Sequence, residues 1–383
     1  MRMIFLIFAI AYYSPTFAQW GSIASPVSGL IFDVKFINDS VGFCAGNDGV
    51  LKTTDYGNTW NLINFSPSGS NLFFINETIG YLTSRNNNEL YKSIDSGNTW
   101  QLNYNFSNET PEGVFFTSTN TGYVITSIYG PPGGSFIYKT TNGGINWTQT
   151  NSFPSIPTLQ AITFTNSNTG FIVGYSGQII KTNNAGTNWI VSQIPNTETL
   201  ISVYFPDQMT GFAVGYSNIS GSDVIKTIDS GNSWQNISSG GTFNSALRGV
   251  YFPTVNTGYA VGENGRIITT NDAGNTWITS NSGVLDDLYS TFFISNNGFA
   301  VGTAGKILKT TTNVSSNAFI DNLKKLKLYP NPTSNQLKIE SKLDIKEITI
   351  IDLTGKSIKT KTTDLNIINV AQLPSGIYFI EVV

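Results

Sequence analysis

The sequence predicts an all-β protein, in which a seven-bladed β-propeller is followed by a small β-sandwich tail domain. Three observations lead to this prediction: an eight-residue phrase that recurs and ends in Trp, a second recurring phrase that begins with Gly and an aromatic residue, and a change of composition after residue 312. With 383 residues, the chain is long enough for one large domain and one small one.

The phrase that ends in Trp, here called the Trp phrase, occurs six times. Its copies span residues 53–60, 93–100, 140–147, 182–189, 227–234 and 270–277, so the tryptophans are 40 to 47 residues apart. A period of this length indicates a repeat architecture, in which each unit buries its apolar surface against its neighbours.

The second phrase, roughly Gly-aromatic-small-Val-Gly, occurs seven times. Its copies begin at Gly42, Gly80, Gly122, Gly170, Gly211, Gly258 and Gly298. The seventh unit has no Trp phrase after it, whereas Trp20 stands alone near the start of the chain. We therefore expect the strand that begins at Trp20 to complete the seventh unit and close the ring, which would remove two exposed sheet edges.

Each unit is predicted to contain four short strands. In the fifth unit these are residues 200–206, 211–216, 223–228 and 233–237, rich in Val, Ile, Phe, Tyr and Thr and separated by Gly, Asn, Asp and Ser. No segment shows sustained helical periodicity. Four strands in each of seven units predict a propeller, and the lack of His and of a terminal Trp-Asp pair disfavours the WD40 type.

The Trp phrase resembles the Asp box, or bacterial neuraminidase repeat. Four copies carry Asp and two carry Asn at the third position, and all end in Trp: Asp55, Asp95, Asn142, Asn184, Asp229 and Asp272, with Trp60, Trp100, Trp147, Trp189, Trp234 and Trp277. Carboxylate and amide oxygens both accept backbone N–H bonds within a tight turn. The phrase is therefore interpreted as a structural turn, and none of these acidic residues is predicted to be catalytic.

The N-terminus has the features of a secretory signal peptide. Arg2 precedes an apolar run from Met3 to Tyr13, and Thr16-Phe17-Ala18 supplies a small-x-Ala cleavage site. We expect residues 1–18 to be removed, residues 19–312 to form the propeller, and no transmembrane segment to remain after cleavage.

Beyond the propeller, residues 313–321 are predicted to be a linker and residues 322–383 a Lys-rich β domain. The expected strands are 336–340, 347–352, 367–370 and 377–383. This tail resembles the C-terminal sorting domain of the type IX secretion system. The residues that carry the resemblance are Tyr329, Pro330, Asn331 and Pro332, then Gly355, then Gly376.

This second resemblance implies that the type IX secretion machinery is a partner. It implies export through the periplasm, followed by release or attachment at the outer cell surface. Tails of that family normally continue past the Gly-Ile-Tyr strand, whereas this sequence stops at Val383, so we expect either that the domain lacks its last strand or that the sequence is truncated.

Composition excludes several classes of function. Charged residues make up 12% of the chain and the net charge is −3, which argues against a nucleic-acid partner. The absence of His excludes Ser-His and Cys-His nucleophilic sites and His-bound metals. The single cysteine, Cys44, is interpreted as a small buried apolar residue. No cofactor, metal or catalytic residue is predicted.

A glycoside hydrolase of sialidase or glucanase type is the alternative function, because Asp boxes also occur in those enzymes. Sialidases, as a family, use three arginines, and this chain has Arg85, Arg248 and Arg266 after the signal peptide, but in positions that do not suggest convergence. The acidic pairs Asp286-Asp287 and Glu109/Glu112 are interpreted as solvated loop residues.

The regular blades are most similar to photosystem II stability/assembly factor-like propellers, a resemblance that covers nearly all of residues 19–312. It implies a non-catalytic propeller that holds a partner. We therefore expect a secreted or surface-displayed scaffold that binds an unknown protein or glycan ligand.

Overall fold

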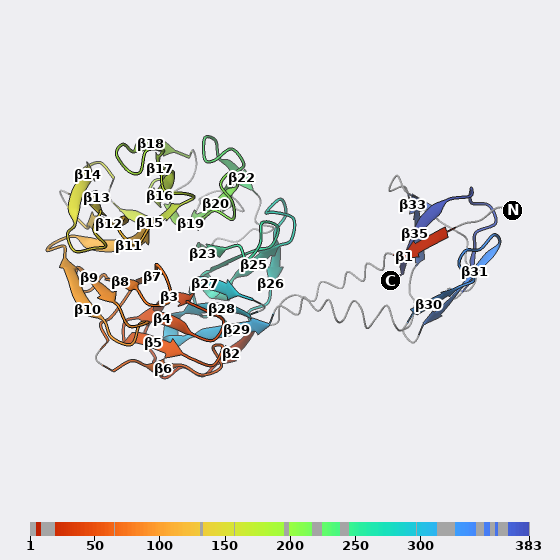
Figure 1. Cartoon of the computed structure of the whole chain (residues 1–383), viewed down its shortest axis with the longest axis horizontal. Helices are drawn as coiled ribbons and strands as arrows, with labels where there is room; N and C mark the ends of the chain where they lie inside the picture. Colours follow the sequence, from red (N-terminus) through yellow and green to blue (C-terminus); the bar gives the residue numbers. More distant parts are fainter. Residues whose placement is uncertain are drawn as a thin grey trace. The chain divides into compact units, whose positions relative to one another are not determined.

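The computed structural model describes residues 5–8, 20–64, 66–130, 133–156, 158–194, 199–216, 224–237, 245–295, 297–311, 326–341, 348–352, 357–358 and 367–382. Two compact units are present, residues 18–312 and residues 1–17 together with 313–383. The first unit is a seven-bladed β-propeller (Figure 1), which confirms the predicted fold class.

Six blades each consist of four strands that are consecutive in sequence. The first three are β3 (Ile31–Phe36), β4 (Gly42–Gly46), β5 (Gly49–Thr53), β6 (Asn61–Leu62); β7 (Asn71–Phe74), β8 (Gly80–Ser84), β9 (Glu89–Ser93), β10 (Gln101–Asn105); and β11 (Thr110–Phe116), β12 (Gly122–Ile128), β13 (Gly134–Thr140), β14 (Thr148–Phe153). The next three are β15 (Leu159–Phe164), β16 (Gly170–Gly174), β17 (Gln178–Thr182), β18 (Ile190–Gln193); β19 (Thr199–Tyr204), β20 (Gly211–Tyr216), β21 (Val224–Thr227), β22 (Gln235–Ile237); and β23 (Leu247–Tyr251), β24 (Gly258–Gly262), β25 (Ile267–Thr270), β26 (Ile278–Ser280).

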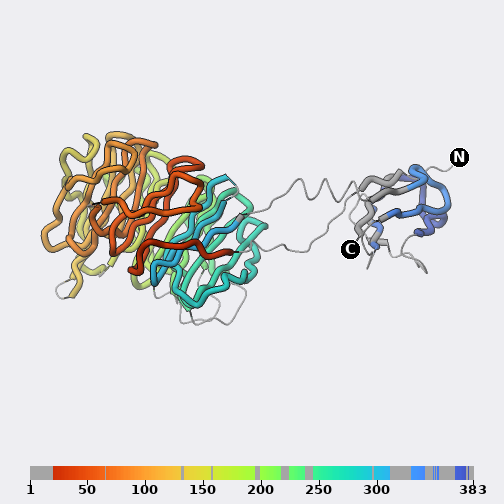
Figure 2. The backbone as a smooth tube through the Cα atoms, turned by 90° about the horizontal axis from the view of Figure 1, so that it is seen from below, coloured from red at the N-terminus to blue at the C-terminus, as the bar shows by residue number. Residues whose placement is uncertain are grey.

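The seventh blade combines the two ends of the propeller. Strands β27 (Leu288–Ile294), β28 (Asn297–Gly302) and β29 (Ile307–Thr311) are followed in the sheet by β2 (Trp20–Ile23). The pairing of β2 with β29 is antiparallel, with Trp20 opposite Thr310 and Ile23 opposite Ile307. In Figure 2 the start of the propeller, in red, runs beside the blue strands that end it.

Because neighbouring strands are antiparallel, successive turns alternate between the two faces of the ring. The turns between the first and second strands and the Trp phrases share one face, here called the Trp-phrase face. Backbone bonds join them, for example from the Tyr56 amide to the Ser40 carbonyl (3.1 Å) and from the Ser96 amide to the Thr78 carbonyl (3.0 Å). The starts of the innermost strands and the turns between the second and third strands lie at the opposite face.

Each boundary between blades contains a stacked pair of aromatic rings, one from the second strand of a blade and one from the end of the next innermost strand. The seven pairs have ring centroids 4.0 to 4.8 Å apart: Phe43–Phe74, Tyr81–Phe116, Tyr123–Phe164, Phe171–Phe205, Phe212–Phe252, Tyr259–Phe293 and Phe299–Phe36. Such pairs contribute about 0.5–1.5 kcal/mol beyond the burial of their area. The boundary between the last and first blades, Phe299–Phe36, is built like the other six.

A lysine adds a polar contact at six of these boundaries. It lies on the third strand of one blade, above the aromatic ring of the second strand, and its ammonium group donates to the Trp phrase of the next blade. The lysines are Lys52, Lys92, Lys139, Lys181, Lys226 and Lys309. The sixth blade carries Thr269 at this position, and the seventh blade, which it faces, has no Trp phrase.

The tail unit contains two sheets. One consists of β30 (Leu326–Tyr329), β31 (Gln336–Ser341) and β34 (Ile367–Asn369), and the other of β1 (Phe5–Phe8), β35 (Ile377–Val382), β32 (Ile348–Asp352) and β33 (Ser357–Ile358). Strand β1, which falls within the predicted signal peptide, pairs in parallel with β35. The predicted linker, 313–321, lies outside the described residues.

Candidate functional site: the central cavity

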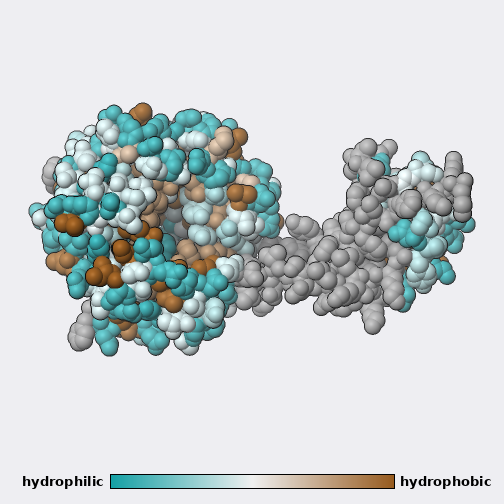
Figure 3. All heavy atoms as spheres, viewed as in Figure 1, coloured by the Kyte–Doolittle hydropathy of each residue, from teal (hydrophilic) through white to brown (hydrophobic). Residues whose placement is uncertain are grey.

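The innermost strands of all seven blades surround a cavity of about 360 Å³. Figure 3 shows the ring hollowed at its centre, with apolar residues around part of the hollow. The cavity lining comes from equivalent positions of β3, β7, β11, β15, β19, β23 and β27, so the fold itself creates the site.

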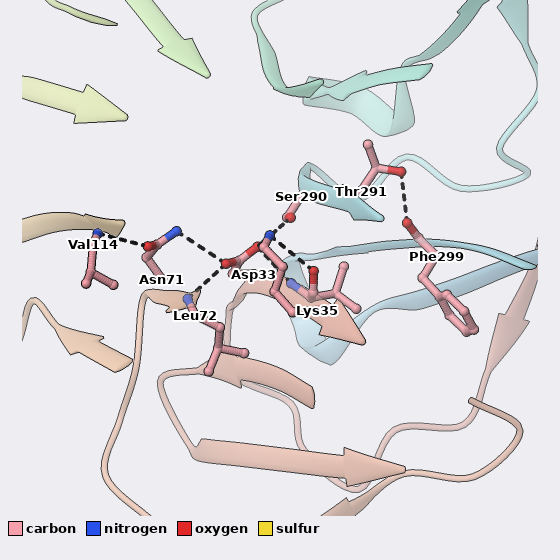
Figure 4. Close-up of polar contacts among 9 residues, drawn as sticks. Asp33, Lys35, Asn71, Leu72, Val114, Ser290, Thr291 and Phe299 are labelled. Atoms are coloured by element: carbon pink, nitrogen blue, oxygen red, sulfur yellow. Dashed lines mark hydrogen bonds and ion pairs between the residues drawn. The ribbon is translucent and has the colours of Figure 1, made fainter. Parts of the chain in front are cut away.

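Polar side chains tie the innermost strands together halfway along the cavity. Asp33 on β3 accepts bonds from the Leu72 amide (2.9 Å) and the Ser290 hydroxyl (2.7 Å), and its carboxylate pairs with Lys35 (2.7 Å). Asn71 extends the chain of contacts, because its side-chain oxygen accepts from the Val114 amide at 3.2 Å (Figure 4). These bonds link four consecutive blades and leave the Asp33 carboxylate fully engaged.

Aromatic rings line the cavity toward the Trp-phrase face. They occupy the position just before the stacked aromatic residue in five blades, namely Phe73, Phe115, Tyr204, Tyr251 and Phe292. Neighbouring rings touch, with centroids 4.9 Å apart for Phe73–Phe115, Tyr204–Tyr251 and Tyr251–Phe292. The other two positions carry Lys35 and Thr163. The result is a largely apolar wall that can pack against flat or aliphatic groups.

A charged cluster lies toward the opposite face of the cavity. Arg85, just after β8, pairs with the buried carboxylate of Glu112 on β11 at 2.8 Å, and the Tyr129 hydroxyl donates to the same carboxylate at 2.6 Å. Burial raises the pKa of Glu112, while Arg85 and the Tyr129 hydrogen bond oppose that rise.

The three arginines do not converge on one point. Arg248 also lines the cavity, where it pairs with Glu263 at 2.6 Å and lies over the ring of Tyr289. Arg266 instead donates to the Ser245 carbonyl at 2.9 Å and is absent from the cavity wall as described. The geometry therefore lacks the arginine triad of a sialidase.

The acidic pairs noted in the sequence also point apart. Glu112 lines the central cavity, whereas Glu109 lines a separate outer hollow and accepts bonds from Thr126 (2.6 Å) and Tyr138 (3.1 Å). Asp286 pairs with Lys306 at 3.3 Å, and Asp287 accepts from the Asn264 amide at 2.9 Å. Each of these carboxylates holds a turn or a strand in place.

Every lysine and arginine of the propeller has a polar partner. The six boundary lysines bond to Trp phrases; Lys35, Lys306, Arg85 and Arg248 pair with carboxylates; and Arg266 bonds to a carbonyl. The three cations that line the central cavity, Lys35, Arg85 and Arg248, are therefore each paired with a carboxylate.

The Trp phrases lie at the rim of the ring, on the Trp-phrase face. In the first phrase, Asp55 Oδ1 accepts from the Thr53 hydroxyl (2.8 Å) and the Thr59 amide (2.9 Å), and Oδ2 accepts from the Thr59 hydroxyl (2.7 Å). Asp95, Asp229 and Asp272 repeat this arrangement with Thr99, Ser233 and Thr276. The single side-chain oxygen of Asn142 and of Asn184 accepts only from the hydroxyl of the first residue and the backbone amide of the seventh.

The seven tryptophans lie edge-on to the stacked aromatic pairs, one at each boundary. The planes of their rings make angles of 73° to 88° with the neighbouring aromatic rings. The residues are Trp20, Trp60, Trp100, Trp147, Trp189, Trp234 and Trp277. Trp20 on β2 packs against Tyr259 and Phe293 and so occupies the seventh equivalent place. None of these residues lines the central cavity.

The remaining sequence-derived residues belong to the tail. Tyr329 ends β30, and Pro330, Asn331 and Pro332 follow it; all four are exposed. Gly376 precedes β35, and Gly355 lies outside the described residues. Cys44 is fully buried in the first blade, and burial raises the pKa of its thiol.

Among the described residues, no three Cys, Asp or Glu side chains are grouped to hold a metal ion. No helix in that part of the chain is long and apolar enough to cross a bilayer.

Comparison with protein families identifies the tail. Residues 327–383 match the secretion system C-terminal sorting domain. A type IX sorting domain at this position marks the protein for secretion or for the cell surface. A comparison with curated proteins finds no match.

Solved structures resemble the propeller. YCF48 from Cyanidioschyzon merolae is 20% identical, with a TM-score of 0.63, over 78% of this chain and 100% of its own. A structure of YCF48 bound to D1 peptide is 19% identical, with a TM-score of 0.62, over 80% of this chain and 98% of its own. The GH74 xyloglucanase from Xanthomonas campestris is 11% identical, with a TM-score of 0.58, over 92% of this chain and 59% of its own. These similarities establish the shared propeller fold.

Proposed function

We propose that the propeller is a non-catalytic binding scaffold that holds a protein or glycan ligand at the central cavity, outside the cell. The observation that carries the proposal is the composition of the cavity wall: aromatic rings toward one face and internally paired charges toward the other. Such a wall offers contact area to a ligand without a free acid, base or nucleophile.

Two further points support this proposal. The peptide bound to YCF48 shows that a propeller of similar fold holds a peptide ligand. In the Trp phrases, which we interpret as Asp boxes, the Asp and Asn side chains at the third position are engaged in turns, and Asn58 accepts a bond from Lys309 of the neighbouring blade. Export would begin with the predicted signal peptide, cleaved after Ala18, and N-terminal sequencing of the secreted protein tests that cleavage point.

A glycoside hydrolase is the second candidate, and the structural similarity to the xyloglucanase supports it. Its most plausible acid is Glu112, because a carboxyl group with a raised pKa suits a general acid. Against this role, Glu112 is bonded to both Arg85 and Tyr129, and Glu109 lies in a different hollow.

The deciding experiment compares binding and turnover with the same purified chain. We expect no release of product from fluorogenic sialosides, xyloglucan or β-glucan. On glycan and peptide arrays we expect a ligand whose binding is weakened by Tyr289→Ala, in the cavity wall, and unchanged by Tyr56→Ala, an exposed tyrosine of the Trp-phrase face. Turnover of a glycan that Glu112→Gln abolishes would establish the hydrolase instead.

A further inference from the structure

Two exposed tyrosines lie side by side on the face opposite the Trp phrases. Tyr175 directly follows β16, the second strand of the fourth blade, and Tyr216 ends β20, the second strand of the fifth. Both are paired with Thr199, the first residue of β19: Tyr216 within the fifth blade and Tyr175 through a bridge between the blades. Residues directly opposite in antiparallel strands project to the same side, so both rings flank Thr199 on one surface.

Both tyrosines are available to a ligand. Their side chains keep substantial exposure, with 40% of Tyr175 and 37% of Tyr216 accessible. Within the described part of the chain neither hydroxyl has a hydrogen-bond partner, in contrast to Tyr129, whose hydroxyl is bound to Glu112. Each residue therefore offers an aromatic face and a free O–H donor, the combination that makes tyrosine frequent at interfaces.

We propose that Tyr175, Thr199 and Tyr216 form a docking surface for a proline-rich segment of a partner protein in the polyproline II conformation. This inference rests on the proposed binding function and specifies its ligand. It adds a second contact area beside the central cavity.

Spacing and hydrogen bonding both favour this ligand. Tyr175 and Tyr216 are separated by one strand, which places their backbones about 10 Å apart. A polyproline II helix repeats every three residues at about 3.1 Å each, so prolines one turn apart, about 9 Å, present their rings to the same side. Its backbone has no internal hydrogen bonds, and its free carbonyls match the two phenolic donors.

Charge is consistent with the same choice. The six boundary lysines are held at the Trp phrases, on the other face, and Arg85 and Arg248, which lie toward this face, are paired with carboxylates, so the surface favours a neutral ligand over an acidic peptide. A neutral, preformed helix also loses little conformational entropy on binding, which suits a small and shallow surface. A glycan also stacks on tyrosine, but its many hydroxyl groups need several polar partners. Besides the two tyrosines, the proposed surface contains only one polar side chain, Thr199.

The test measures anisotropy of fluorescein-labelled decaproline with the full chain, using a Gly-Ser peptide of equal length as the reference ligand. We expect decaproline to bind and the Gly-Ser peptide not to bind. Tyr175→Ala and Tyr216→Ala should each raise Kd about tenfold or more, as expected when an aromatic anchor worth about 1.4 kcal/mol is removed. Tyr56→Ala, which removes a more exposed tyrosine on the other face, should leave Kd unchanged.

Tyr216→Phe separates the two contributions, because it keeps the ring and removes the donor, so an intermediate Kd is expected. Thermal unfolding of each variant should match that of the parent, since these side chains are exposed. The proposal is overturned if decaproline fails to bind, or if the two alanine variants bind it as tightly as the parent. Binding of cellohexaose that is lost in the same variants would assign the surface to glycans. If the docking proposal fails but a ligand from the arrays still loses affinity in Tyr289→Ala, the proposed binding function stands without the polyproline surface.

Discussion

At the scale of single residues, the third and seventh positions of the Trp phrase change together. Where the third residue is Asp, the seventh is Thr or Ser, and its hydroxyl donates to the second carboxylate oxygen, as Thr59 does to Asp55. Where the third residue is Asn, the seventh is also Asn, at Asn146 and Asn188, and the seventh residue then bonds to the single oxygen through its backbone amide alone. The carboxylate therefore varies with the presence of a hydroxyl donor at the seventh position, which indicates a structural role rather than a catalytic one.

A double-mutant cycle in the first blade tests this matching. Asp55→Asn alone should lower the free energy of unfolding by about 0.5–1.5 kcal/mol, because the Thr59 hydroxyl loses an acceptor. Adding Thr59→Asn should cost less than the same change in the parent, since it reproduces the pair present in the third blade. Urea unfolding measures both energies, and strictly additive effects would contradict the matching.

The four aspartates also predict how acid affects the propeller. Hydrogen bonds from the Thr59 amide and hydroxyl lower the pKa of Asp55 to about 2, and bonds from Ser233 lower the pKa of Asp229. A depressed pKa in the folded state stabilises it above the unfolded pKa, and this stability is lost as pH falls through the folded value.

Unfolding temperatures should therefore drop between about pH 4 and pH 2. A variant with Asn at positions 55, 95, 229 and 272 should show a smaller drop over the same range, although it is less stable at pH 7. Equal slopes in calorimetry for both proteins would count against these groups as the cause.

At the scale of the blade, neighbouring units are joined by the same three contacts: a stacked aromatic pair, an edge-on Trp and a lysine that reaches the next Trp phrase. Lys181 represents the last of these, because its ammonium group donates to the Ser230 carbonyl and to Asn232, both at 2.7 Å, and lies over the ring of Phe171. Thr269 replaces the lysine only where the next blade has no Trp phrase to receive it.

Lys181→Met should destabilise the propeller by about 1–2 kcal/mol, because it removes two charge-assisted bonds between blades while keeping the aliphatic stem. Thr269→Lys provides the matched control, since the added ammonium finds no Trp phrase and should not increase stability. Chemical unfolding of both variants measures the difference in free energy. An unchanged free energy of unfolding for Lys181→Met would contradict a stabilising role of this contact.

The sequence predicts the blades better than it predicts the cavity. In the fifth blade the predicted second strand, 211–216, matches β20, and the third differs from β21 by one residue at each end, because recurring Gly and aromatic residues mark these positions in every unit. The aromatic wall could have been recognised by aligning the residues just before the aromatic residue that ends each innermost strand or follows it. The Asp33–Ser290 contact could not, because those residues occupy corresponding positions in the first and last blades and meet only when the ring closes.

At the scale of the whole molecule, the tail determines where the propeller works. Its strands β31, β32, β34 and β35 follow the predicted ones within two residues, because alternating apolar residues and Gly- or Pro-containing turns define them. The match of residues 327–383 to a sorting domain assigns export to this unit.

Deleting residues 327–383 should therefore leave the protein in the periplasm, while the full chain reaches the surface or the medium. Cell fractionation and immunoblotting measure the distribution. The truncated chain should unfold at the temperature of the parent propeller, because the propeller is a separate compact unit. Normal export of the truncated chain would contradict this role of the tail.

Ring closure is the central claim, because the cavity and every boundary contact depend on it. The most direct test is the unfolding temperature of a chain that starts at residue 29, with and without a synthetic peptide of residues 19–28. The shortened chain loses β2 and Trp20, so it should unfold at a much lower temperature, and the peptide should restore stability in proportion to its concentration. An unchanged unfolding temperature after the deletion, with no response to the peptide, would contradict closure by the N-terminal strand.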